Sequence, residues 1–195
     1  MLLLLLPTAT LFALAVFYDT FPGDDALLRV LRIYDEPLRG FFAWFDISPV
    51  ASLSMTGFLL GVCLVRRSVW DSLTVLLVLP AQGLVIVLPK LFLGRPRPEG
   101  ALAGATDSFP SGTAATAILV LGLAIYFVGL YVTQPRLRIA LQGVLVLAVA
   151  ALGVFRLLAG EHYPSDVLGG WLGGALALVV LVGCHRRMGR GMRAA

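Results

Sequence analysis

The chain is poor in charged residues, in cysteine and in histidine, and each shortage excludes a class of protein or site. Asp, Glu, Lys and Arg make up 13% of its 195 residues, whereas hydrophobic residues make up 59%. A soluble globular protein cannot bury so large an apolar fraction. The apolar residues also fall in long runs, which are typical of membrane-spanning helices. The composition therefore predicts a polytopic membrane protein.

Cysteine, histidine and clustered charge are too scarce for several common kinds of site. Cys63 and Cys184 both lie near segment ends that we expect to face the cytoplasm, so we expect no disulfide. The two histidines, His162 and His185, are expected on opposite sides of the membrane, and no group of residues has metal-ligand spacing. We therefore expect no metal and no cofactor. The net charge is +4, but the basic residues are scattered, so we expect no nucleic-acid partner.

Six apolar segments predict six transmembrane helices in a single domain over residues 1–195. The first, residues 1–18, has no positive n-region and no clear A-x-A site. We therefore favour a retained helix over the rival interpretation, a cleaved signal peptide. The other five segments are residues 49–65, 73–93, 113–132, 139–155 and 167–184. The predicted fold class is all-α.

The arginines set the expected orientation of these helices. Six spans put both termini on one side, together with Arg66, Arg67, Arg136, Arg138 and the four arginines of the C-terminal tail. The positive-inside rule makes this side cytoplasmic. We expect a bacterial inner membrane protein, with residues 19–48, 94–112 and 156–166 in extracytoplasmic loops. Within the first loop, residues 25–34 have the spacing of an amphipathic helix on the membrane surface.

Residues 156–166 place a guanidinium, an imidazole and carboxylates between two apolar segments, where the chain meets water. Pro164 can begin a helix, because its missing N–H would be unpaired there in any case. Asp166 then falls in the first turn and can reach back to one nitrogen of His162, which fixes the tautomer and leaves the other nitrogen facing outward. The alternative is a wetted loop histidine beside a capping aspartate.

Two further stretches predict an oxyanion site on the same side of the membrane. Lys90, Arg95 and Arg97 gather three cations within eight residues, facing the His–Asp pair. For Lys90 alone, a cation that snorkels to the interface is the alternative. Ser111 and Gly112 open the next helix, whose first N–H groups have no intrahelical partner and can bind an anion. An ordinary Pro-Ser helix cap is the alternative there.

Together these stretches resemble the type 2 phosphatidic acid phosphatase family, which shares its site with the vanadium haloperoxidases. The matching motifs, all within residues 90–166, are Lys-x6-Arg-Pro (Lys90, Arg97, Pro98), Pro-Ser-Gly (Pro110, Ser111, Gly112) and Arg-x5-His-x3-Asp (Arg156, His162, Asp166). The resemblance implies metal-independent hydrolysis of a lipid phosphate outside the cytoplasm. It implies that His162 attacks phosphorus to give a phosphohistidine and that Asp166 orients it. The phosphate oxygens would be held by Lys90, Arg97, Ser111, Gly112 and Arg156.

One departure from the family motif bears on the substrate. Thr113 stands where the family has a histidine that protonates the leaving group, and threonine cannot do so near neutral pH. A diphosphate tolerates this loss, because the phosphate monoester that leaves has a second pKa of about 6. A polyprenyl diphosphate such as undecaprenyl diphosphate is therefore favoured, with phosphatidate and phosphatidylglycerophosphate as alternatives. Glu161 or Asp107 are the other candidates for supplying the proton.

A second class of function would keep the phosphate site and lose the chemistry. A non-catalytic relative that binds phospholipids would also tolerate Thr113. Retention of His162, Asp166 and the cations argues against this alternative, since charged groups at the membrane edge are costly to keep. We therefore expect a membrane hydrolase whose partner is a lipid phosphate in the bilayer.

Overall fold

The computed structural model describes residues 2–102 and 107–191. All regular structure in these two ranges is helical. In chain order the elements are α1 (Leu2–Phe17), α2 (Asp24–Leu31), α3 (Glu36–Trp44), α4 (Pro49–Val65), α5 (Val69–Leu76), α6 (Val78–Gln82), η1 (Gly83–Val87), α7 (Leu88–Leu93), α8 (Gly112–Thr116), η2 (Ala117–Leu121), α9 (Gly122–Tyr131), α10 (Pro135–Leu158) and α11 (Pro164–Gly191).

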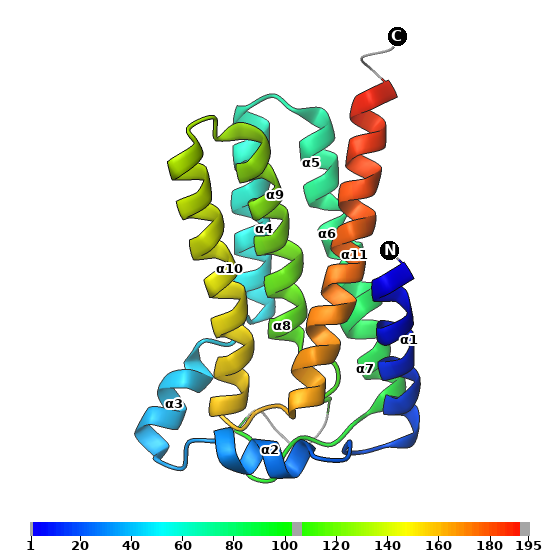
Figure 1. Ribbon diagram of the computed structural model, residues 1–195, viewed down its shortest axis with the longest axis vertical. Helices are drawn as coiled ribbons and strands as arrows, with labels where there is room; N and C mark the ends of the chain where they lie inside the picture. The colour runs from blue at the N-terminus through cyan, green and yellow to red at the C-terminus, as the bar shows by residue number, and fades with distance from the viewer. Residues whose placement is uncertain (1, 103–106, 192–195) are drawn as a thin grey trace.

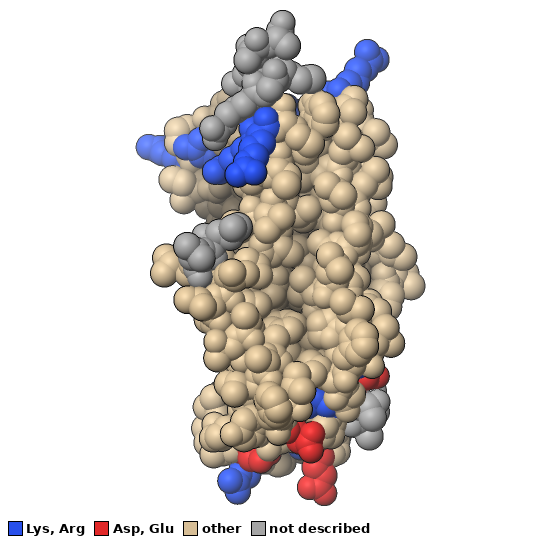
Figure 2. Space-filling model, turned by 90° about the vertical axis from the view of Figure 1, so that its right-hand side faces the viewer, with Lys and Arg blue, Asp and Glu red and all other residues tan. Residues whose placement is uncertain are grey.

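The long helices run side by side along the molecule, and α2 and α3 lie across one end (Figure 1). Within the described residues, 5 helical stretches are long and apolar enough to cross a membrane: Glu36–Val65, Val69–Leu93, Gly112–Tyr131, Pro135–Leu158 and Pro164–Met188. Charged side chains gather at the two ends of the face in Figure 2, with a broad uncharged belt between them. This surface is what a bilayer requires. The all-α polytopic class is confirmed for the described chain.

The remaining apolar helix, α1, is shorter than the five stretches that are long enough to cross a membrane. Its 16 residues extend over about 24 Å at ~1.5 Å per residue, which is less than the ~30 Å of a typical hydrocarbon core. α1 packs beside α11, and its first turn points toward the end of the bundle at which α11 ends (Figure 1). The number of six spans and the side of the N-terminus stay predictions.

The arginine-rich turns and the predicted site lie at opposite ends of the bundle. The α4–α5 and α9–α10 connections lie at the upper end in Figure 1, whereas α2, α3 and the connections from α7 to α8 and from α10 to α11 lie at the lower end. Arg66 and Arg67 belong to the upper end, and His162 belongs to the lower end. The arginine-rich turns and the predicted site are therefore separated by the length of the bundle.

The loop at residues 19–48 is more closely tied to the bundle than the sequence predicts. The expected amphipathic helix at 25–34 ends at Leu31, and α3 follows. Arg39 of α3 is buried and donates from Nε to the Ala159 carbonyl at 2.8 Å. The ring centroids of Phe42 and Phe45 lie 5.0 and 5.1 Å from that of Phe155 on α10. α3 therefore packs against the end of α10 and its following turn.

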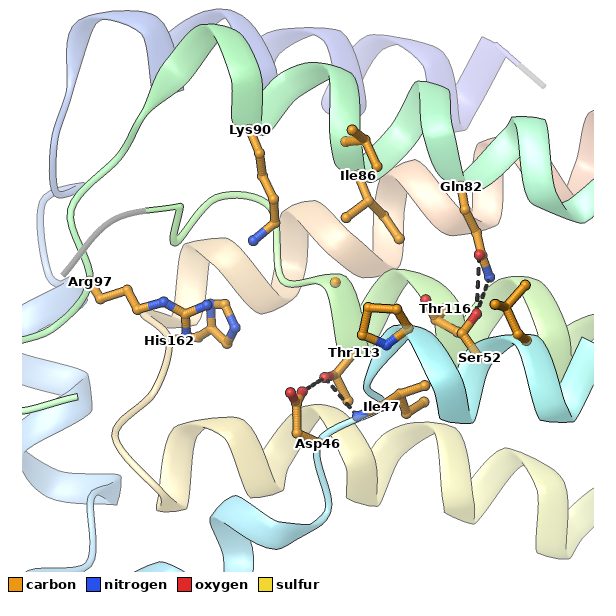
Figure 3. A pocket seen from close by; sticks show the side chains of 14 residues that line it. Asp46, Ile47, Ser52, Gln82, Ile86, Lys90, Arg97, Thr113, Thr116 and His162 are labelled. Atoms are coloured by element: carbon orange, nitrogen blue, oxygen red, sulfur yellow. Dashed lines mark hydrogen bonds between the residues drawn. The ribbon is translucent and has the colours of Figure 1, made fainter. Parts of the chain in front are cut away.

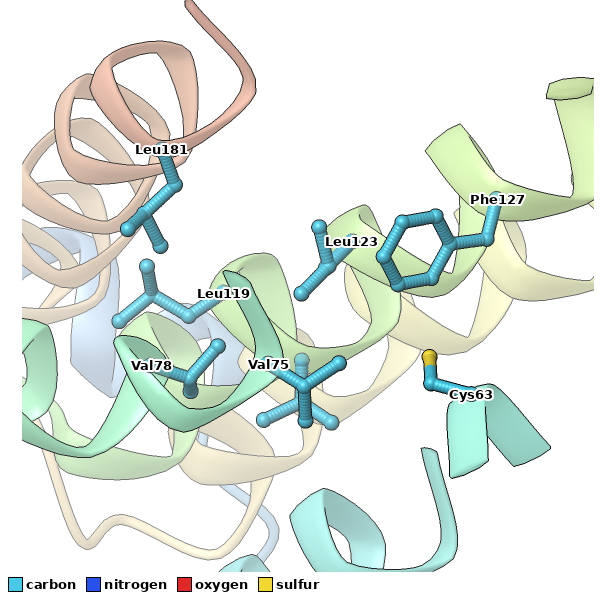
Figure 4. Packing of buried hydrophobic residues seen from close by; sticks show 8 residues of the cluster. Cys63, Val75, Val78, Leu119, Leu123, Phe127 and Leu181 are labelled. Atoms are coloured by element: carbon cyan, nitrogen blue, oxygen red, sulfur yellow. The ribbon is translucent and has the colours of Figure 1, made fainter. Parts of the chain in front are cut away.

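Close contact between α11 and α8 brings the predicted motifs together. A Cβ at Gly170 would lie 2.6 Å from the Ser111 carbonyl oxygen, and one at Gly174 would lie 2.9 Å from the Ala115 carbonyl oxygen. Glycine is needed at both positions because the backbones nearly touch there. Farther along the bundle the core is apolar and includes Val75, Leu119 and Leu123 (Figure 4).

We predict that Gly170→Ala destabilises the protein, by about 1–3 kcal/mol, because the added methyl group forces α11 away from α8. Gly183→Ala is the matched control, since it lies in the same helix and a Cβ there meets nothing within 4 Å. Thermal unfolding in detergent measures the difference. Equal melting temperatures for the two variants would contradict this account of the contact.

Candidate active site

The connection from α10 to α11, residues 159–163, positions the predicted catalytic pair. Gly160 has a φ of 66°, and a Cβ there would lie 2.6 Å from Nε of Arg32, so the turn requires glycine. Pro164 begins α11, as the sequence predicts, and Asp166 lies in its first turn. The Tyr163 N–H donates to Oδ2 of Asp166 at 2.8 Å. This bond fixes the carboxylate at the helix start, beside His162.

His162 and Asp166 form a buried pair. Nδ1 of His162 lies 3.5 Å from Oδ2 of Asp166, and the two side chains are 4% and 0% exposed. A carboxylate on this side favours a proton on Nδ1 and leaves Nε2 unprotonated. Burial lowers the pKa of His162 from its ordinary value of 6.5; Asp166 opposes the shift, and Arg97 and Lys90 add to it. The imidazole is therefore neutral near pH 7, which is the form that a nucleophile needs.

Arg95 forms an ion pair with Asp166 and does not line the cavity. Its side chain is 1% exposed, and Nη1 donates to Oδ1 of Asp166 at 2.5 Å and to Oγ of Ser165 at 2.8 Å. Its Nη2 pairs with Oδ2 of Asp24 at 2.9 Å. The expectation of three cations around the oxyanion is therefore wrong for Arg95. A buried guanidinium needs carboxylates close by, and Asp166 and Asp24 supply them.

A cavity of about 420 Å³ opens in front of His162 (Figure 3). One part of it is polar and includes Asp46, Lys90, Arg97, Thr113 and His162, while another part is mainly apolar. The full lining is Asp46, Ile47, Pro49, Ser52, Leu53, Gln82, Ile86, Val87, Lys90, Arg97, Gly112, Thr113, Thr116 and His162. This volume is in the usual range for a ligand site.

Lys90 and Arg97 bring two cations to the polar part of the cavity. Lys90 projects from α7, and its Nζ donates to the Asp107 carbonyl. Arg97 lies in the loop that follows α7, close to His162 in Figure 3. Its Nη1 donates to the Glu161 carbonyl at 3.1 Å and lies 3.6 Å from Oε2 of Glu161. Two cations and an imidazole on one cavity wall can bind a multiply charged oxyanion.

Ser111 and Gly112 lie where α8 begins, as predicted. Oγ of Ser111 accepts from the Ala114 N–H at 3.5 Å, which makes Ser111 the helix cap. Ser111 is fully buried, and its N–H donates to the Asp166 carbonyl at 2.9 Å. Of the two residues only Gly112 lines the cavity. The helix start therefore presents its backbone to the cavity at Gly112. Ser111 instead links the start of α8 to α11 through its backbone hydrogen bond.

Arg156 points toward α3 and is not part of the cavity lining. Its Nη1 pairs with Oδ1 of Asp46 at 2.9 Å, and Nη2 donates to the carbonyls of Phe42 and Ala43 at 3.2 and 2.9 Å. The side chain is buried, and its Nε has no hydrogen-bond partner among the described residues. Direct binding of phosphate by Arg156 stays a prediction.

Thr113 is bound to a residue that the sequence reasoning missed. Its hydroxyl donates to Oδ1 of Asp46 and accepts from the Ile47 N–H at 3.3 Å (Figure 3). Asp46 lies in the short connection between α3 and α4, 67 positions away in sequence. Its only sequence signal is an acidic residue just before an apolar helix, which is common at membrane surfaces. The cavity therefore contains a carboxylate next to the position where the family has histidine.

Glu161 and Asp107, the other candidates for the leaving-group side, lie outside the cavity lining. Glu161 is 2% exposed, lies 3.9 Å from Nη2 of Arg39 and accepts from the Leu102 N–H at 2.8 Å. Asp107 is exposed, and its backbone has a φ of 64°. The structure thus places Glu161 between the buried Arg39 and the partly buried Arg97, where it holds Arg97 in position.

The described residues offer no ready metal site. In residues 2–102 and 107–191, no three His, Cys, Asp or Glu side chains come close enough together to hold a metal ion. The polar side chains that line the cavity are an imidazole, two cations, a carboxylate, the hydroxyl groups of Ser52, Thr113 and Thr116, and the amide of Gln82. They can bind a phosphate and attack it directly.

Two comparisons of the sequence agree on the relatives of this chain. The sequence model of the PAP2 superfamily matches residues 68–190. Phosphatidylglycerophosphatase B of Bacillus subtilis is 27% identical over 183 residues, which cover 86% of each protein. Lipid A 1-phosphatase of Rhizobium etli is 31% identical over 115 residues, covering 50% of this chain and 45% of the relative.

Two crystal structures have a similar fold. One is a transmembrane PAP2-type phosphatidylglycerolphosphate phosphatase from Bacillus subtilis, with a TM-score of 0.81 and 22% identity over 95% of this chain and 96% of that one. The other is LpxE of Aquifex aeolicus, with a TM-score of 0.60 and 24% identity over 85% of this chain and 98% of that one. At these identities the match establishes the fold.

We predict that His162 titrates below pH 6.5, because burial and the two neighbouring cations disfavour the imidazolium. Asp166→Asn should lower the pKa of His162 further, and Arg97→Met should raise it. NMR of protein with labelled histidine, in detergent, measures these values, and the signal absent from His162→Asn identifies the residue. A wild-type value above 6.5 would contradict the buried, neutral imidazole.

Proposed function

Because the chain belongs to the PAP2 superfamily, we propose that it is a membrane lipid phosphatase. The observation that carries the proposal is the cavity in which His162 faces Lys90 and Arg97, with Asp166 behind the imidazole. An imidazole, two cations and a helix start around one cavity are suited to phosphoryl transfer, which depends on positioning and charge neutralisation. No step in it requires a metal ion.

The apolar part of the cavity supports a lipid substrate. It includes Leu53 of α4 and Ile86 and Val87 of η1. Leu53 and Val87 are also more than half exposed on the surface of the described chain, within stretches suited to the membrane. An acyl or prenyl chain can therefore extend from the cavity into the bilayer without passing charged groups. A water-soluble phosphate ester would gain nothing from this wall.

The reaction follows from which imidazole nitrogen is available. Asp166 lies against Nδ1, so Nε2 of His162 is the nucleophile. It attacks phosphorus, a P–N bond forms, and the bond to the leaving oxygen breaks. Lys90 and Arg97 bind the phosphate oxygens and neutralise the charge that develops on them. Water then cleaves the phosphohistidine and restores the free imidazole.

Thr113 favours a substrate whose leaving group needs no proton. An alkoxide leaving from a phosphate monoester is strongly basic, whereas a lipid monophosphate leaving from a diphosphate has a second pKa of about 6. A polyprenyl diphosphate, converted to the monophosphate, is therefore the preferred substrate. Phosphatidate and phosphatidylglycerophosphate are the monoesters to compare with it, the latter because of the name of the Bacillus relative.

We place the protein in a bacterial cell membrane with the cavity on the extracytoplasmic side. Arg66, Arg67, Arg136 and Arg138 are in the turns at the end opposite the cavity, or in the helix turns next to them. The positive-inside rule assigns that end to the cytoplasm. The matched relatives are bacterial.

His162→Ala should abolish phosphate release, because it removes the nucleophile. Asp166→Asn should leave a slower enzyme whose imidazole is less well oriented, with a loss of about 10²-fold or more. The assay is phosphate release by purified protein in detergent, and the wild-type rate should be unchanged by EDTA. Activity lost in EDTA and restored by a divalent ion would contradict the mechanism.

The wild type should cleave a polyprenyl diphosphate much faster than the matching monophosphate. Thr113→His should raise the monophosphate rate, by about 10²-fold if the new imidazole reaches the leaving oxygen. Thr113→Asn is the control, because asparagine is similar in size to histidine but has no group that titrates near neutral pH and so cannot act as the acid. The substrate panel also includes phosphatidate and phosphatidylglycerophosphate.

Equal wild-type rates on mono- and diphosphates would show that another group already acts as the acid. Phosphate release by Thr113→His from substrates that the wild type binds without turnover would instead support the second candidate, a phospholipid-binding relative.

A further inference from the structure

Asp46 supplies a carboxylate to the cavity from an unexpected element. It lies between α3 and α4, while Lys90, Arg97 and His162 come from α7, from the loop after α7 and from the connection before α11. Of the 14 cavity-lining residues in the described chain, Asp46 is the one with a carboxyl group. Lys90 and Arg97 bind the phosphate and His162 attacks it, so Asp46 is left as the group able to accept a proton.

The contacts of Asp46 keep it ionised and leave one oxygen available. The Thr113 hydroxyl donates to Oδ1, and Nη1 of Arg156 lies 2.9 Å from the same oxygen. No described residue bonds to Oδ2, and the side chain is 53% exposed. A carboxyl group paired with a guanidinium is charged near neutral pH. Asp46 is therefore a fixed carboxylate that can accept a proton from water in the cavity.

We infer that Asp46 is the catalytic base that activates water for hydrolysis of the phosphohistidine. This inference rests on the proposed function. The water oxygen bonds to phosphorus as the P–N bond breaks, and the electron pair of that bond returns to Nε2 of His162. One water proton passes to Oδ2 of Asp46, which then releases it to the departing phosphate or to solvent.

The same contacts explain why Asp46 does not act as the acid in the first step. A carboxylate that is already ionised has no proton to give to the leaving oxygen. The first half-reaction therefore still depends on a good leaving group, as Thr113 implies, while the second half-reaction has its base. Asp46 therefore takes no proton-donating part in the first half-reaction and serves as the base in the second.

The test separates the two half-reactions in protein purified in detergent, with the best substrate of the panel labelled in its terminal phosphate. Asp46→Asn should form the phosphoenzyme within about threefold of the wild-type rate, while steady-state phosphate release falls by about 10²-fold or more. Acid-labile, alkali-stable label should therefore accumulate on the protein. Asp25→Asn, which removes an exposed carboxylate from α2, is the matched control and should behave as wild type.

Two more variants keep the test decisive. Asp46→Glu retains the charge next to the buried Arg156 and moves the carboxylate, so it should fold normally and hydrolyse the phosphoenzyme at an intermediate rate. It decides the question if Asp46→Asn loses its melting transition. The double variant Asp46→Asn, Thr113→His should regain part of the hydrolysis rate, because the imidazole can act as the base.

The inference is overturned if Asp46→Asn slows phosphoenzyme formation and hydrolysis equally, with no label accumulating, since Asp46 would then only hold Arg156. Wild-type rates in Asp46→Asn would overturn it as well. A wild-type protein that releases no phosphate from any substrate would instead be a failure of the proposed function, and so the two failures are distinguishable.

Discussion

The buried ion pair between Arg95 and Asp166 is the contact on which the site depends. Asp166 is fully buried and also accepts from the Ser108 hydroxyl and the Tyr163 N–H. Arg95 continues the network to Asp24 at the start of α2. Breaking a buried pair costs about 3–5 kcal/mol, because the remaining charge is left without compensation. This network fixes the loop after α7, the start of α11 and α2 relative to one another, and with them the position of His162.

Much of the fold and the centre of the site could be predicted from local sequence. Long apolar runs indicate the helices, and Pro164 marks the start of α11 with Asp166 in its first turn. Lys90, Arg97, Gly112 and His162 lie in short motifs, and the structure brings all four to one cavity. These positions could be anticipated because each rests on a helix end or a spacing of a few residues, whereas the roles of the side chains in catalysis stay predictions.

The rest could not be predicted because it depends on distant pairing. Nothing local shows whether a cation such as Arg95 faces substrate or a buried carboxylate, and its partner Asp24 is 71 positions away. Asp46 and Arg156 are likewise joined only in the folded chain. The apolar run at residues 1–18 likewise predicts a helix, while its packing against α11 appears only in the folded chain.

A second His–Asp pair shows why such a pair is not by itself a site. At the opposite end of the bundle, Nε2 of His185 lies 2.7 Å from Oδ1 of Asp71, and Nδ1 lies 2.8 Å from the Tyr126 hydroxyl. Both ring nitrogens are occupied, so this imidazole joins α5, α9 and α11 and has no lone pair free for attack. His162 uses only one nitrogen for its carboxylate and lies in a cavity with two cations. The chemistry therefore depends on an imidazole that lies in a cavity beside two cations, and not on a His–Asp pair alone.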